Sequence, residues 1–156
     1  MSRGSMPQRT TNLLFFCGLV LLHGAAFGSE VSVTDFGAVA DGDVTGAQGD
    51  DSCLAFNRSI EAARQKNATV LRIPAGTYHF YWDTCPQALI YVSNTVTTPT
   101  TSSPLPPKPI GLWLRDLSDI VVEGEGSTLL FHGLMTSIAV DGSHNVTVRS
   151  HTMHLL

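Results

Sequence analysis

Alternating apolar positions fill the second half of the chain. Aliphatic residues two positions apart are typical of a strand with one face turned inward. The same spacing recurs 26 positions further along the chain. A period of this length indicates stacked units that bury their apolar faces against their neighbours. The matched pairs are Leu112 with Ile138, Leu114 with Val140, Ile120 with Val146, and Val122 with Val148.

Turn-forming residues divide this region into short strands, three to each period of 26 residues. A three-sided coil fits that division, whereas an antiparallel sandwich more often has two-residue hairpin turns. The pattern therefore predicts an all-β fold, a parallel β-helix (a three-sided solenoid) with about 26 residues per coil. The expected strands are 110–114, 120–123, 128–131, 137–140 and 146–149.

One amphipathic helix is expected before the coils, over residues 52–65, with Asp50 or Asp51 as its N-cap. It would cover the open first coil, whose unpaired edge otherwise invites aggregation. Its apolar face carries Cys53, Phe56, Ile60 and Ala63. The expected strands around it are a first strand through Val31, Val33 and Phe36, then 69–73 and 77–81.

The N-terminus has the pattern of a secretory signal peptide, residues 1–28. Arg3 and Arg9 precede an apolar run at 13–22, and small residues follow up to Gly28. The run is too short for a bilayer, which needs roughly 20 apolar residues. We therefore expect a secreted, periplasmic or cell-surface protein with no stable membrane span after cleavage.

Composition excludes one class of partner. The net charge is −4, and no cluster of Arg and Lys forms the basic stripe that nucleic acids require. A segment rich in Thr, Ser and Pro, residues 96–109, lacks apolar periodicity and predicts an exposed loop.

Cys53 and Cys85 remain once the leader is removed. In an exported protein they could form a disulfide, but Cys53 on the apolar helix face could equally be a buried free thiol. Neither has metal-ligand spacing around it. The stretch from Asp41 resembles the start of a calcium loop, yet its twelfth position is Ser52 instead of a bidentate Glu. We expect no metal and no cofactor.

Two sets of motifs resemble known families. The first resembles the opening of the pectate-lyase superfamily, which implies a right-handed parallel β-helix with an N-terminal cap. The second is similar to the exported α-1,3-galactosidases of glycoside hydrolase family 110. The first set is residues 35–38, 41–42, 50–51 and 74–78; the second is 91–95, 108–112, 122–129 and 132–136.

The resemblance runs over residues 31–150 and matches only the N-terminal part of such an enzyme. We therefore expect residues 29–150 to form the N-terminal cap and first coils of a β-helix domain. Residues 151–156 do not continue the pattern as another strand would, so they predict a non-matching tail of a C-terminally truncated chain.

The resemblance implies a glycosidase that releases terminal α-1,3-linked galactose with inversion, so the partner is a carbohydrate with terminal α-linked galactose. Inversion requires two carboxyl groups roughly 6.5–9.5 Å apart. In the family these acids come from central coils and match no position here, so the catalytic residues are unknown and the chain alone is expected to be inactive. Alternatives are another β-helix carbohydrate enzyme, a polysaccharide lyase or galacturonase, and a non-catalytic carbohydrate-binding or adhesin β-helix.

His132 and Trp113 are the candidate substrate-binding residues. His132 lies in a His-Gly-Leu-Met-Thr run, and a structural histidine at a coil turn is the alternative. Trp113 points away from the coil interior and could stack on a sugar ring, as Trp82 could, or pack under the long loop. Asp119 and its repeat mate Asn145 are expected to be stacked turn residues.

Overall fold

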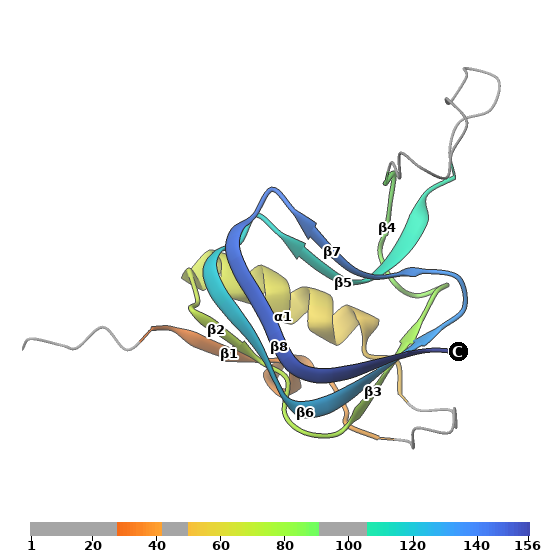
Figure 1. The fold of residues 1–156 in the computed structure, drawn as a ribbon, viewed down its shortest axis with the longest axis horizontal. Helices are drawn as coiled ribbons and strands as arrows, with labels where there is room; N and C mark the ends of the chain where they lie inside the picture. The colour runs from red at the N-terminus through yellow and green to blue at the C-terminus, as the bar shows by residue number, and fades with distance from the viewer. Residues whose placement is uncertain (1–27, 42–49, 91–105) are drawn as a thin grey trace, which may run out of the picture.

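The computed structural model describes residues 28–41, 50–90 and 106–156. In this part the fold is mostly β, with a parallel sheet and one α-helix (Figure 1). The expected signal peptide lies outside the described residues except for Gly28, as does most of the expected loop 96–109. The elements are β1 Glu30–Ser32, the 3-10 helix η1 Val33–Phe36, α1 Cys53–Lys66, β2 Val70–Arg72, β3 Thr77–Tyr81, β4 Gln87–Ala88, β5 Lys108–Arg115, β6 Ser118–His132, β7 Thr136–Asp141 and β8 His144–Leu155.

The period of 26 residues corresponds to parallel strand pairing. β5 pairs with β7, placing Leu112 beside Ile138, and β6 pairs with β8, placing Ile120 beside Val146. Repeat mates are therefore neighbours in adjacent strands, as the spacing predicts.

The earlier strands join the same sheet at a longer sequence spacing. β2 and β3 both pair with β6 in parallel, with Val70 beside Val121 and Tyr78 beside Leu129. β1 adds to β2, while β4 pairs antiparallel with β5. The long connection between β3 and β5 lengthens the spacing, so the repeat is visible in the sequence only between the last two layers.

β6 is one bent strand where two were expected. Its bend contains Glu125 at φ 47° and Gly126 at φ 81°. Gly124 is required beside it, because a Cβ there would lie 2.5 Å from the carbonyl oxygen of Ser150 in β8. The two strands thus turn the same corner in close contact (Figure 1).

The expectation for residues 151–156 is wrong in one respect, since β8 continues to Leu155. Ser127 lies beside His151 and Phe131 beside Leu155, a spacing two residues shorter than before the bend. Ser150 alone turns the corner that takes three residues in β6. A fixed period of 26 residues therefore aligns residues 151–155 with the wrong residues of β6, which is why the sequence did not predict this part of the strand.

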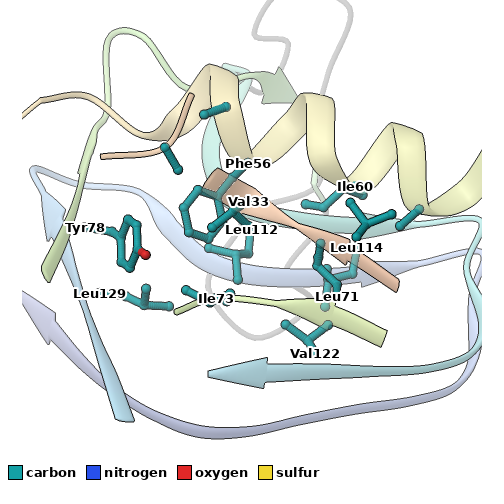
Figure 2. Close-up of a cluster of buried hydrophobic side chains, with 14 of the residues drawn as sticks. Val33, Phe56, Ile60, Leu71, Ile73, Tyr78, Leu112, Leu114, Val122 and Leu129 are labelled. Atoms are coloured by element: carbon teal, nitrogen blue, oxygen red, sulfur yellow. The ribbon is translucent and has the colours of Figure 1, made fainter. Parts of the chain in front are cut away.

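α1 covers the inside of the first strand layer (Figure 2). Phe56 and Ile60 point from the helix toward Leu112, Leu114 and Leu71 on the strands below, and all of them are buried. The Phe56 ring meets the edges of Tyr78 and Phe80, with centroids 5.4 and 4.9 Å away. This burial and the aromatic contacts stabilise the strand layer under α1, which includes β5 and β6 and is called the covered layer below.

Several element ends differ from expectation. The N-cap is Ser52, although the Asp51 carboxylate accepts the N–H of Cys53 at 3.1 Å. Val33 and Phe36 lie in η1 instead of the first strand, which ends at Ser32. Lys108 and Pro109 belong to β5 instead of the loop.

Candidate functional site

An aromatic stack lies where β3 and β6 end. In β3 the side chains of Tyr78 and Phe80 face the core, so His79 and Tyr81 face the opposite way. The ring of His132 in β6 is stacked on both, with centroids 5.1 Å from His79 and 4.4 Å from Tyr81. His132, a candidate from the sequence, is therefore in contact with two aromatic neighbours.

The two histidines also share a hydrogen bond. Nδ1 of His79 and Nε2 of His132 lie 2.9 Å apart, so one ring donates to the other. Burial, and then the neighbouring His79, lower the pKa of His132. His79 is fully buried, and its Nε2 has no hydrogen-bond partner among the described residues. Burial of a histidine favours its uncharged form, which suits a packing role for His132.

Trp113 lies in the middle of β5, on a different side of the structure from the stack. It is half-buried beside Ala139 of β7, and the Arg115 guanidinium lies 4.8 Å from its ring centroid. This cation–π contact occupies one face of the indole. The structure therefore does not bring Trp113 and His132 into a common site.

A groove of about 480 Å³ lies at the corner after β3 and β6. We call it the corner groove; it is lined by Trp82, residues 106–109 and residues 134–136. Trp82 is 53% exposed and Leu134 is 96% exposed. Neither His132 nor Trp113 lines the groove, although His132 is joined to it through the chain and by the N–H of Trp82, which donates to the His132 carbonyl at 3.2 Å.

Three glutamates of the sheet form ion pairs with arginines of neighbouring strands. Arg72 of β2 pairs with Glu30 and Glu125, and Arg149 of β8 pairs with Glu123 at 2.6 Å. Hydrogen bonds from Ser150 and Arg149 lower the pKa of Glu123. On α1, hydrogen bonds from Arg64 and Gln65 lower the pKa of Glu61 to about 2. A general acid needs a raised pKa, so neither glutamate fits that role.

Asp119 and Asn145 are stacked at a turn, as expected. Both have positive φ, 53° and 51°, and the Asn145 amide donates to the Asp119 carboxylate at 2.7 Å. Asn and Asp are among the residues that best tolerate this left-handed backbone. This pair serves the turn and shows no feature of a catalytic site.

Cys53 and Cys85 are joined by a disulfide, with Cα atoms 5.1 Å apart. The bond ties the first turn of α1 to the turn after β3. Of the two possibilities that the sequence left open, the structure has the bonded one.

Metal-ligand clusters of three or more His, Cys, Asp or Glu are absent from the described residues. The Asp41 carboxylate accepts the N–H of Asp50 at 3.0 Å, while residues 42–49 between them lie outside the described part. None of the described helices is long and apolar enough to cross a membrane.

Comparison with known proteins finds alpha-1,3-galactosidases among the relatives of this chain. Alpha-1,3-galactosidase A of Bacteroides fragilis (strain YCH46) is 32% identical over 139 residues, 86% of this chain and 21% of the relative. The chain is a distant homologue of alpha-1,3-galactosidases. Alpha-1,3-galactosidase A of Peterkaempfera griseoplana is 34% identical over 80% of the chain and 17% of its own length. Alpha-1,3-galactosidase B of Parabacteroides distasonis is 28% identical over 87% and 22%.

The chain thus spans about a fifth of the length of the curated relatives it matches. No family model matches it.

Sequence reasoning missed His79 and Tyr81 as the partners of His132. Their alternation with Tyr78 and Phe80 was a usable signal, since it places both on the outer face of β3. The sequence indicated the corner groove less clearly, because the groove combines Trp82 with two segments that are distant in the chain.

Proposed function

We propose that this chain forms the N-terminal coils of a right-handed parallel β-helix in an exported glycoside hydrolase that removes terminal α-1,3-linked galactose with inversion. The observation that carries the proposal is the homology to alpha-1,3-galactosidases over most of the chain. The parallel pairing of repeat mates is consistent with stacked coils.

In this proposal the chain supplies scaffold and a substrate-facing corner, while the acid and base come from other coils. The two described glutamates with shifted pKa values are both shifted downward. The Asp119 carboxylate accepts a hydrogen bond from its repeat mate Asn145. Contacts of His132 or Trp113 with the substrate stay predictions, as does export through residues 1–28.

The proposal is tested with a chimera. Residues 29–150 replace the aligned segment of the Bacteroides fragilis enzyme, and galactose release from an α-1,3-linked galactose disaccharide is measured. We expect activity within about tenfold of the parent enzyme, because a matching scaffold leaves the acids in place. The unfused chain should release no galactose above a heat-killed control.

Two results would overturn it. A folded chimera without activity would show that these coils do not fit such an enzyme. Galactose release by the unfused chain would show that the acid pair lies within it, contrary to the proposed division.

A further inference from the structure

The corner groove is built around an indole held in a fixed position. The backbone N–H of Trp82 donates to the carbonyl of His132 and fixes the backbone from which the side chain extends. Its ring lies so close to Gly133 that a Cβ there would be 2.6 Å from Cδ1, and Gly133 has φ 88°. Only glycine fits both the backbone angle and the contact. The backbone of one corner therefore supports the indole while about half of the side chain remains exposed.

The other lining residues divide into apolar walls and two polar groups. Three prolines of residues 106–109 and Leu134 form the walls, and the polar side chains are Lys108 and Thr136. Small-molecule sites typically measure about 300–1,000 Å³ and combine apolar surface with a few placed polar groups. The groove, at about 480 Å³, has both properties.

A galactosyl residue matches this surface. Its axial 4-hydroxyl leaves the C–H groups of C3, C4 and C5 on one face of the ring, and a flat apolar face suits an aromatic platform. The remaining hydroxyls can accept from the Lys108 ammonium and bond with the Thr136 hydroxyl. A purely apolar ligand would leave Lys108 unpaired, and an acidic peptide would find a single cation.

We propose that the corner groove is a galactoside-binding subsite in which the sugar stacks on Trp82 and hydrogen-bonds to Lys108 and Thr136. This inference rests on the proposed function for the choice of sugar. It adds a specific contact to that function, outside the stack of His79, Tyr81 and His132.

Ligand-observed saturation-transfer NMR on the full chain tests the subsite directly. The probes are methyl α-D-galactopyranoside and its C4 epimer methyl α-D-glucopyranoside. We expect saturation of the galactoside, strongest at H3, H4 and H5, and at least about threefold weaker binding of the glucoside, because its equatorial 4-hydroxyl breaks up the apolar face. Equal binding of the two epimers, or no saturation of either, would overturn the proposal.

Point variants of the lining residues test which side chain contacts the sugar. Trp82→Ala should weaken galactoside binding about tenfold or more, and Lys108→Met by a few fold. Leu54→Ala, an exposed change on α1 outside the groove, is the matched control and should bind as the parent does. Unchanged binding by a folded Trp82→Ala variant would refute the subsite. Loss of binding in Trp113→Ala with Trp82→Ala unaffected would refute it as well, by placing the sugar on β5.

The outcomes separate the two proposals. An active chimera that is unaffected by Trp82→Ala, together with a chain that does not bind the galactoside, removes the subsite and keeps the hydrolase scaffold. Epimer-selective binding to the chain with an inactive folded chimera keeps the subsite and removes the hydrolase role.

Discussion

The covered layer under α1, which includes β5 and β6, and the outer layer of β7 and β8 share one sequence pattern but differ in how deeply their apolar side chains are buried. Leu114 in the covered layer is fully buried, while its repeat mate Val140 in β7 is 56% exposed. Ile120 is buried, whereas its mate Val146 is half-buried. The pattern thus reports which way a side chain points, and the neighbouring layer decides how much of it is buried.

The two layers also differ in their edges. α1 lies over the covered layer (Figure 1). The disulfide between Cys53 and Cys85 fixes its first turn. In the part of the chain that the structure describes, no strand lies beyond β7 or β8, which pair only with β5 and β6. Leu155, near the end of β8, is 70% exposed.

The largest effect is expected from truncating Leu114, and the same truncation of its repeat mate Val140 is the comparison. Leu114→Ala should lower the free energy of unfolding by about 2–5 kcal/mol, because it leaves a cavity in a packed layer. Val140→Ala should cost less than about 1 kcal/mol, since much of the side chain is already in water. Urea unfolding of both variants measures the difference. Equal costs would remove the contrast between the layers.

The disulfide should have the next largest effect. Cys53 and Cys85 are 32 positions apart, and closing a loop of that size stabilises a fold by about 3–4 kcal/mol in the chain-entropy model. We expect the free energy of unfolding of the Cys53→Ser, Cys85→Ser double variant to be lower by this amount, so its urea midpoint should fall. The parent under reducing conditions should match the double variant. An unchanged midpoint would show that α1 stays in place without the bond.

The sequence was sufficient for features that depend on local periodicity. The helix expected at 52–65 lies at Cys53–Lys66, because its apolar face is a local periodic pattern in the sequence. The alignment of Leu112 with Ile138 followed from the period. The shorter spacing between β6 and β8 after the bend could not be predicted. A bend of three residues in β6 is matched by Ser150 alone in β8, and this difference leaves no periodic signal in the sequence.

The candidate site was less accessible to sequence reasoning. His132 was identified, but its partners His79 and Tyr81 are far away in sequence and were brought near by pairing of β3 with β6. The corner groove depends on where residues 106–109 and 134–136 meet around Trp82. These contacts depend on connections between strands whose lengths do not repeat, so the sequence contains no periodic pattern that predicts them.

The smallest expected effect is a pH dependence of stability at His132, which lies at the end of β6 in the covered layer. Its pKa is lowered in the fold by burial and by His79, and Tyr81 faces it from β3. The unfolded chain therefore binds more protons below about pH 6.5, so stability should be full above that pH and fall as the pH drops. The slope contributed by one proton is at most about 1.4 kcal/mol per pH unit.

Thermal unfolding between pH 7.5 and 5.5 measures this dependence. His132→Phe keeps an aromatic ring in the stack and removes the titrating group, so its melting temperature should fall less over the same range. A variant with the parent's pH dependence would assign the effect to other groups.

In the proposed hydrolase the outer layer lies beneath a further coil, and galactose release by the chimera tests this central proposal most directly. Val140→Asp should be tolerated in the unfused chain, where the side chain is 56% exposed, with thermal unfolding little changed. In the chimera, where the enzyme's next coil would cover β7, the same change buries an unpaired carboxylate and should abolish galactose release. Thr147→Asp, whose position in β8 faces away from the interior, is the matched control and should keep most of the activity. Full activity of the Val140→Asp chimera would contradict the claim.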